Sequence, residues 1–221
     1  MIDREKIIVI VPTLDGRPCI ETMVSLVHTE PFYHTCISLA GISNISLARN
    51  KIAHRFLALS QYEWLMMVDS DMVFSVDDWH LLWEGDEDIV TAEYSKKILG
   101  EPPAQFGLGF TRVHRSVFEK IDALNTENGV EFAQRFYLEG EMYVNYFPNM
   151  ASSESRWVSE DHGFFVLASL SDVRPRVEKR TKLRHVGKLE YGYPDQIPIA
   201  VLEKLLAKAK AREILEAGLH D

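Results

Sequence analysis

The sequence is poor in cysteine and has no long apolar run. Cys19 and Cys36 are the two cysteines among its 221 residues, and they form neither a CxxC motif nor a disulfide framework. Such usage is typical of a reducing cytosol. No stretch approaches the ~20 apolar residues that a membrane span needs, and the apolar run beginning at Ile7 is too short and too β-branched for a signal peptide. We therefore expect a cytoplasmic protein without integral membrane association.

Long basic runs are also absent, and the formal net charge is -9. This balance does not indicate general binding to a phosphate backbone, although it is compatible with a local basic groove. The composition, 46% hydrophobic and 26% charged, is that of a globular protein with a full core. No internal repeat or clear linker divides the chain, so we predict a single domain over residues 1–221.

Apolar runs and helical patterns alternate in the first half of the chain. Three runs have the continuous pattern of strands that are buried on both faces: residues 7–11, 64–68 and 89–92. A helical pattern from Ser46 to Leu59 separates the first two, and a short helix capped by Ser75 separates the last two. This order predicts an α/β fold with a mainly parallel sheet and helical crossovers.

The second half of the chain is less regular. Its predicted elements are a strand over 105–111, a helix over 115–124, an excursion with a short hairpin over 125–149, a helix over 160–170 and a strand over 176–184. A C-terminal amphipathic helix is indicated by Ile199, Leu202, Leu206 and Ala209. It could cover the core, pair with a second subunit or lie on a membrane. Lysine and glutamate mix on its polar face, which makes the membrane the weakest option.

Two carboxylates stand one residue apart after the second apolar run, in Asp69-Ser70-Asp71. Residues i and i+2 of a strand share a face, so both side chains can approach one cation at a strand end. Mg²⁺ or Mn²⁺ prefers such oxygen ligands and would bridge a diphosphate. An acidic turn that caps the following helix is the alternative. The position after a buried strand favours the metal, and with it a nucleotide-dependent transfer enzyme.

A second acidic pair, Glu160 and Asp161, follows Ser159 where an apolar helix is predicted to begin. Acidic residues at a helix start often serve only to complement the helix dipole. The functional interpretation is a general base that takes the proton from an acceptor hydroxyl as it attacks. We favour Asp161 for that role and Glu160 for a supporting one.

Other candidates are a histidine, two basic residues and two glycines. The imidazole of His185 is a candidate third metal ligand beside two carboxylates. Arg49 lies near the start of a predicted helix and could face a nucleotide phosphate or base, whereas Lys51 is better explained as part of a solvated face. Gly107 and Gly109 either let the backbone pass close to a substrate or form a bulge.

The order of these motifs resembles that of GT-A-fold glycosyltransferases of the family 2 type, and most of all a branch common in bacteria and bacteriophages. The resemblance covers about residues 5 to 190. Its elements are Pro12-Thr13, Ser46 to Asn50, Trp64 to Asp71, Gly107 to Phe110, Ser159 to Asp161 and His185 to Gly187.

The resemblance implies a Rossmann-like GT-A domain that uses a nucleotide-diphosphate sugar as donor. Asp69 and Asp71, with His185 as a further ligand, would hold Mn²⁺ or Mg²⁺ on the diphosphate. The nucleotide pocket would involve Pro12, Thr13, Arg49, Asn50, Asp69 and Ser70. Asp161 would act as the base in a direct, inverting displacement, with the metal offsetting charge on the leaving diphosphate. About 1–100 would then be the nucleotide-sugar half, about 101–195 the acceptor and catalytic half, and about 196–221 the C-terminal helix.

The sequence departs from the family pattern at two places. The Gln-x-x-Arg-Trp element and the membrane helices of processive family 2 synthases are missing, which favours transfer of a single sugar. After Ser159-Glu160-Asp161, relatives usually carry an Arg-rich helix, whereas residues 164–170 are apolar here. The acceptor is therefore open: a saccharide, a lipid-linked or a protein hydroxyl.

Two alternatives compete with this interpretation. One is a bacteriophage enzyme, working in the host cytoplasm, that glycosylates hydroxymethylated or hydroxylated pyrimidines in DNA. Its basic face would comprise Lys96, Lys97, Arg112, Arg115 and the cluster 174–184. The other is a non-catalytic protein that binds a nucleotide sugar or a partner, including a second copy of the chain, through the C-terminal helix.

Overall fold

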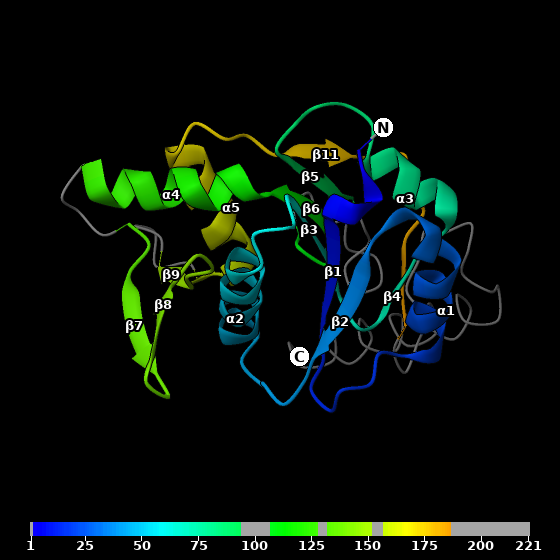
Figure 1. Cartoon of the computed structure of the whole chain (residues 1–221), viewed down its shortest axis with the longest axis horizontal. Helices are drawn as coiled ribbons and strands as arrows, with labels where there is room; N and C mark the ends of the chain where they lie inside the picture. Colours follow the sequence, from blue (N-terminus) through cyan, green and yellow to red (C-terminus); the bar gives the residue numbers. More distant parts are fainter. Residues whose placement is uncertain (1, 94–106, 128–131, 152–156, 187–221) are drawn as a thin grey trace, which may run out of the picture.

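The computed structural model describes residues 2–93, 107–127, 132–151 and 157–186, and their core is a six-stranded sheet (Figure 1). The strands are, in spatial order, β11 (Arg176–Glu178), β5 (Ile89–Ala92), β6 (Phe110–His114), β3 (Trp64–Val68), β1 (Ile7–Pro12) and β2 (Thr35–Leu39). β1 pairs in parallel with β2 and β3, and β11 pairs in parallel with β5. β6 runs antiparallel between β3 and β5. The predicted α/β fold with a mainly parallel sheet is confirmed.

Helices cover both faces of this sheet (Figure 1). One face carries α1 (Ile20–Thr29) and α3 (Val76–Leu82), and the other carries α2 (Ile45–Ala58), α4 (Arg115–Glu127) and α5 (Glu160–Leu170). Because successive side chains of a strand point to opposite faces, β1 supplies both cores. Ile8 and Ile10 pack with the α2, α4 and α5 side, and Val9 packs with the α1 and α3 side. Within the described ranges, no helix has the length and apolar character that crossing a bilayer requires.

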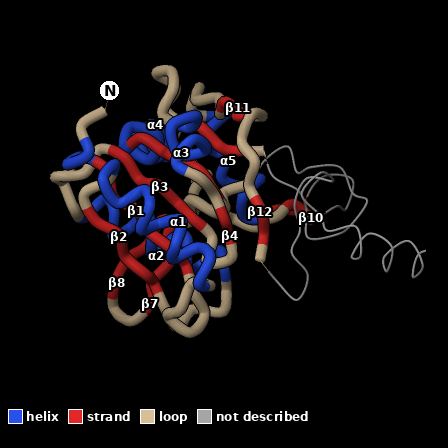
Figure 2. Tube along the Cα trace, turned by 90° about the vertical axis from the view of Figure 1, so that its right-hand side faces the viewer, coloured by secondary structure: helices blue, strands red, loops and turns tan. Residues whose placement is uncertain are grey.

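Short elements complete the described part. Two single-turn helices, η1 (Arg4–Lys6) and η2 (Glu30–Phe32), flank β1 and β2. Three two-stranded pairs lie outside the central sheet: β4 (Met72–Val73) with β12 (Arg184–His185), β7 (Arg135–Leu138) with β8 (Glu141–Val144), and β9 (Met150–Ala151) with β10 (Trp157–Val158). Figure 2 shows β4 and β12 side by side at one flank of the sheet. The β7–β8 pair confirms the hairpin that was predicted within residues 125–149.

Local sequence signals account for several helix boundaries. Ser75 caps α3 through a capping box with Asp78, which satisfies free backbone N–H groups at the helix start. Helix α5 begins at Glu160 and ends at Leu170, as predicted, and α4 begins at Arg115. The predicted inner face of α2 is also observed, since Ile52 and Phe56 are fully buried.

Other boundaries were predicted wrongly. The strand expected over 105–111 begins only at Phe110, because the Gly107 carbonyl instead accepts hydrogen bonds from the hydroxyls of Thr91 and Thr111. The strand expected over 176–184 is split into β11 and β12, which belong to different sheets. Helix α1 and strand β2 were not predicted. The C-terminal helix over 196–221 lies outside the described residues, as do residues 105 and 106.

Candidate active site

The backbone of Asp69-Ser70-Asp71 is held by three separate segments at the end of β3. The Asp69 N–H donates to the Gly109 carbonyl at 2.8 Å. The Ser70 carbonyl accepts from the Cys19 N–H at 2.8 Å, at the start of α1. The Asp71 carbonyl accepts from the Val186 N–H at 2.8 Å, beyond β12. The backbone of the turn is therefore fixed by three segments, and this sets the positions from which its two carboxylate side chains extend.

Gly109 makes room for the Asp69 carboxylate. A Cβ atom at this position would lie 2.7 Å from Asp69 Oδ2, closer than real Cβ atoms come to another heavy atom, and 3.1 Å from the Met72 methyl carbon, which is a tight contact. The glycine therefore serves a close approach between β6 and the carboxylate, one of the two roles expected for this glycine-containing segment.

Arg49 joins the two acidic motifs. Its Nη1 atom donates to Glu160 Oε1 at 2.6 Å and lies 3.6 Å from Asp161 Oδ1. Its Nη2 atom donates to Asp69 Oδ1 at 3.3 Å. The Arg49 side chain is only 4% exposed, so this cation sits behind the carboxylates and is shielded from water. The structure thus brings Arg49 together with Asp69, 20 positions away in the sequence, and with Glu160, 111 positions away.

Helix α2 is anchored so that Arg49 reaches Glu160. The Ser46 hydroxyl donates to the Phe147 carbonyl at 2.5 Å. The Asn50 amide nitrogen donates to Asn145 at 2.8 Å, and its oxygen accepts from the Phe147 N–H. Positions i, i+3 and i+4 of a helix lie on one face, so Ser46, Arg49 and Asn50 all face this segment. Asn50 was expected at the nucleotide pocket, and its observed contacts are with the 145–147 segment.

Helix α5 packs closely on the end of that segment. A Cβ atom at Gly163 would overlap the Pro148 carbonyl oxygen. Phe164 stacks on Phe147 with ring centroids 4.9 Å apart. The first turn of α5, which carries Glu160, is therefore positioned by the same segment that anchors α2.

The two carboxyl groups at the start of α5 have pKa values that are shifted in opposite directions. Burial raises the pKa of Glu160, and the neighbouring Asp161 charge adds to this while Arg49 opposes it. Burial would also raise the pKa of Asp161, but attraction to Arg49 and hydrogen bonds from Glu160, Ser159 and the backbone outweigh it and lower that pKa. Asp161 is thus the member of the pair that is held ionised, as a general base must be.

A cavity of about 220 Å³ opens beside the turn. It is lined by the loop after β1, the loop before α2 and the turn itself: Pro12, Thr13, Leu14, Ile42, Ser43, Ile45 and Ser70. Three of the residues expected at a nucleotide pocket therefore line one cavity. Arg49, Asn50 and Asp69 were expected there too, but they are not among the residues that line it. The volume is below the ~300 Å³ at which sites for whole small molecules begin, so the cavity suits one portion of a ligand.

His185 is brought to the turn by the pairing of β12 with β4. It is 4% exposed and lies opposite Met72, while the next residue, Val186, bonds to Asp71. In the described ranges, no three His, Cys, Asp or Glu side chains already form a metal-binding group. The donor chemistry nevertheless fits Mg²⁺ or Mn²⁺ in the mode in which one or two carboxylates bind the ion and phosphate oxygens and water complete its shell. His185 as a third ligand stays a prediction.

The prediction that Arg112 and Arg115 belong to a basic face for DNA binding is wrong. Arg112 is fully buried, with its guanidinium 4.6 Å from the Trp64 ring centroid and 5.3 Å from that of Trp83. Burial lowers the pKa of Arg112 to about 10. Arg115 donates to four backbone carbonyls in and after α2. Neither side chain is available to contact phosphates.

No protein family model matches the chain, and no curated protein sequence matches it. Among solved structures, it is similar to A197 from STIV, with 16% identity, coverage of 86% of this chain and 91% of that one, and a TM-score of 0.56. It is also similar to the catalytic domain of Drosophila beta1,4-galactosyltransferase 7 in complex with xylobiose, with 15% identity, coverage of 79% of this chain and 65% of that one, and a TM-score of 0.50. The chain has a GT-A-like glycosyltransferase fold. At these identities, the likeness concerns the fold alone.

Within this GT-A-like fold, sequence reasoning missed how the site is held together. It placed Arg49 against a nucleotide, whereas the structure places it between Asp69 and the α5 carboxylates. The spacing of Ser46, Arg49 and Asn50 on one helix face was the available signal, but a polar face opposite an apolar one is ordinarily solvated. The burial of Arg49 and Asn50 is visible only in the structure. Gly163 gave no such signal, since its role depends on the distant Pro148 carbonyl.

Proposed function

We propose that this protein is a metal-dependent glycosyltransferase that moves a single sugar from a nucleotide-diphosphate sugar to an acceptor hydroxyl. The observation that carries the proposal is the Arg49 bridge. It joins the Asp69-Ser70-Asp71 turn, which is suited to a metal and a diphosphate, to the carboxylate pair Glu160 and Asp161, which is suited to proton transfer. The cavity lined by Pro12, Thr13 and Ser70 lies beside the same turn, where it would receive part of the donor nucleotide.

Proton transfer is assigned to the α5 pair, Glu160 and Asp161. As the acceptor oxygen attacks the anomeric carbon, Asp161 takes the hydroxyl proton and the bond from that carbon to the diphosphate oxygen breaks. Attack from the face opposite the leaving group inverts the anomeric configuration. Glu160 and Arg49 support the step by holding Asp161 in place and ionised.

Stabilisation of the leaving group is assigned to the Asp69-Ser70-Asp71 turn. Asp69 and Asp71, with His185 as a further candidate, would hold Mn²⁺ or Mg²⁺. When bound, such an ion offsets the negative charge that develops on the departing diphosphate. Gly109 contributes by leaving the Asp69 carboxylate free of steric conflict.

Membership of the family 2 type, and of its bacterial and bacteriophage branch, is part of the proposal and rests on the order of motifs. Modified DNA is the less favoured acceptor, because Arg112 and Arg115 are committed to internal contacts and Arg180 is paired with Glu84 and Glu178. A hydroxyl on a saccharide, lipid-linked or protein acceptor is favoured instead.

The test combines donor binding and transfer. Thermal-shift measurements with a panel of nucleotide sugars, each with and without Mn²⁺, should give stabilisation by one nucleotide class that depends on the metal. Transfer or hydrolysis of that donor is then followed with Asp71→Asn, which should weaken binding. A panel without any metal-dependent stabilisation, together with donor turnover that survives Asp71→Asn, would show that the turn is not the donor site.

A further inference from the structure

Helix α1 carries an apolar face on its outer side. The exposed fractions are 79% for Ile20, 46% for Met23, 48% for Val24 and 65% for Val27. These residues follow the i, i+3, i+4, i+7 spacing of one helix face, and together with His28 they line a depression of about 330 Å³. An exposed apolar patch with a polar border often marks a surface that binds another protein, so this face is a candidate interface.

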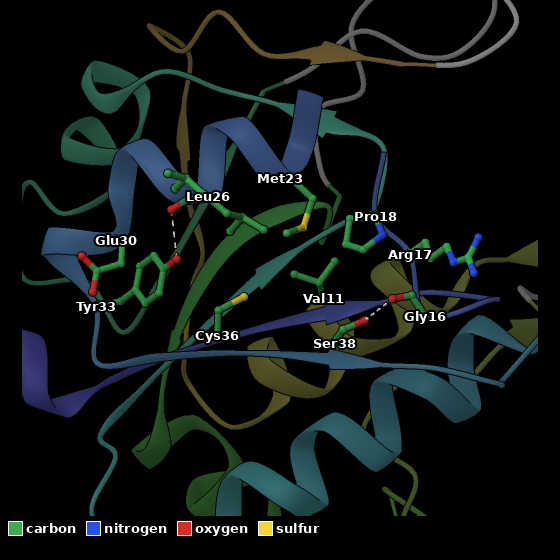
Figure 3. Close-up of a pocket in the computed structure, with 11 residues that line it drawn as sticks. Val11, Gly16, Arg17, Pro18, Met23, Leu26, Glu30, Tyr33, Cys36 and Ser38 are labelled. Atoms are coloured by element: carbon green, nitrogen blue, oxygen red, sulfur yellow. Dashed lines mark hydrogen bonds between the residues drawn. The ribbon is translucent and has the colours of Figure 1, made fainter. Parts of the chain in front are cut away.

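A groove with opposite charges at its two ends runs beside this face, between α1 and the edge strand β2 (Figure 3). Its volume is about 640 Å³, and its apolar lining includes Met23 and Leu26. Figure 3 shows Glu30 at one end of the groove and Arg17 at the other. These two are the charged residues among those that line it. The groove therefore has a negative and a positive end.

Both end charges can reach a second molecule. Arg17 is exposed, and in the described part of the chain its guanidinium forms no ion pair. The Glu30 side chain is 63% exposed, and its contact with Arg4 is long, at 3.9 Å. On the other flank of the apolar face, α1 carries Glu21 and His28, which are exposed and lie about two turns apart. Each flank of the face thus has a residue of acidic character and a basic one.

The apolar residues of α1 form a pattern that complements itself. In an antiparallel pair of helices related by a two-fold axis, residues at equal distances from the axis lie beside each other. An axis between Met23 and Val24 places these two residues side by side across the pair. The same axis places Ile20 beside Val27 of the partner subunit. One arrangement therefore covers all four exposed apolar side chains.

The charged residues fit nearly the same axis. Arg17 and Glu30 lie at equal sequence distances from it and at opposite ends of the groove, so each faces the opposite charge of the partner. Glu21 and His28 are centred one residue further along the helix, a shift of about 1.5 Å, and a carboxylate accepts hydrogen bonds from an imidazole. Complementary charges of this kind select one orientation. The carboxylates of Asp15, Glu21 and Glu30 also disfavour an anionic membrane as the partner.

We propose that α1 and the adjoining groove form the interface of a homodimer, in which two copies of this chain pair with their α1 helices antiparallel about a two-fold axis. The interface would lie next to the candidate active site, because the Cys19 N–H and the Thr22 hydroxyl at the start of α1 both donate to the Ser70 carbonyl. The assignment is independent of any transfer activity.

Sedimentation equilibrium of the full-length chain measures the pairing. We expect a reversible dimer with a Kd of about 1 to 100 µM, because the interface of each copy is one helix of ten residues and one groove. Val24→Asp places like charges close together at the axis and should raise the Kd at least about tenfold, without lowering the midpoint of urea denaturation. Val166→Asp is the matched control. Val166 is 42% exposed on α5, which packs on the other face of the sheet, so the Kd should be unchanged.

Exchange of the end charges tests the two-fold arrangement. Arg17→Glu and Glu30→Arg should each raise the Kd at least about tenfold, because like charges then meet at both ends of the interface. An equimolar mixture of these two variants should form heterodimers with the wild-type Kd, since both contacts again join opposite charges. A heterologous contact or a purely structural role of either residue does not produce this recovery.

Each alternative has its own result. A wild-type chain that stays monomeric up to about 200 µM, or a dimer that Val24→Asp leaves intact, overturns the proposal. Failure of the mixed variants to recover overturns the antiparallel pairing. Binding of a monomer to phosphatidylglycerol vesicles that Val24→Asp abolishes would assign the face to a membrane, and it would also overturn the proposal.

Discussion

Arg49→Met removes the cation that bridges Asp69, Glu160 and Asp161. Removing one partner from a buried ion pair costs about 3–5 kcal/mol, because the remaining charge is left without compensation. The side chains of Asp69 and Asp161 keep 26% and 20% of their exposure, so water offsets part of this cost. We therefore expect the variant to lose about 3 kcal/mol of unfolding free energy at pH 7.

The loss should shrink as the pH falls. In the wild-type protein, Arg49 contributes to holding the pKa of Asp161 below its ordinary value of 3.8. The stability gained from Asp161 is therefore present above that value and is lost only as the pH falls through the lowered pKa. Without Arg49, burial and mutual repulsion raise the pKa of both α5 carboxyls, so the variant regains stability as they are protonated. The difference from wild type should fall from about 3 kcal/mol at pH 7 to below about 1.5 kcal/mol at pH 4.5.

Urea denaturation at both pH values measures this difference. A loss of about 3 kcal/mol corresponds to a midpoint lowered by roughly 1 to 2 M. Lys51→Met is the matched control, because Lys51 lies on the same helix and pairs at 3.3 Å with Glu139, whose side chain is 76% exposed. Exposed pairs contribute at most about 1 kcal/mol. Equal losses for the two variants, or an Arg49→Met loss that is the same at both pH values, would refute the bridging role of Arg49.

Three further substitutions test the close contacts and ion pairs of the fold. Gly109→Ala should displace the Asp69 carboxylate and weaken metal-dependent nucleotide binding at least about tenfold in calorimetry, with little change in unfolding free energy; unchanged binding would contradict the role given to this glycine. Gly163→Ala should lower the unfolding free energy, measured by urea denaturation, by about 2 kcal/mol or more, because the overlap of the new Cβ with the Pro148 carbonyl outweighs the gain in helix propensity. A variant more stable than wild type would show that the contact relaxes freely. Side-chain hydrogen bonds from two arginines lower the pKa of Glu178 to about 2, so its contribution is present above the ordinary pKa and is lost as the pH falls toward 2. Glu178→Gln should therefore lower the unfolding free energy by on the order of 2 kcal/mol at pH 7, and the difference from wild type should vanish in acid. A difference that does not change with pH would exclude the ion pairs as its cause.

Residues with strong local signals were predicted well. The continuous apolar runs of β1, β3 and β5 predicted buried parallel strands, and the Ser75 cap predicted the start of α3. These features depend on neighbours in the sequence, so the pattern itself contains the information. The predicted start of α5 placed Glu160 and Asp161 at a helix N-terminus, where the structure has them.

Features that depend on tertiary contacts were not predictable in the same way. Helix α1 has apolar residues on its outer as well as its inner side, which blurs its periodicity, and β2 is only half-buried at a sheet edge. The direction of β6 was not predicted, because its antiparallel insertion between β3 and β5 follows from chain topology. Likewise, Arg49 contacts carboxylates from two segments that are distant in the sequence, and a sequence pattern cannot specify that these segments meet.

The most direct test of the central claim is the effect of Asp161→Asn on sugar transfer from the donor that binds with Mn²⁺. The asparagine keeps the size of the side chain and removes the base. We predict that transfer falls by a factor of about 100 or more, while metal-dependent binding of the nucleotide sugar stays within about threefold of wild type. Transfer at the wild-type rate by a folded Asp161→Asn protein would contradict the assignment of Asp161 as the base and of the α5 pair as the catalytic half of the site.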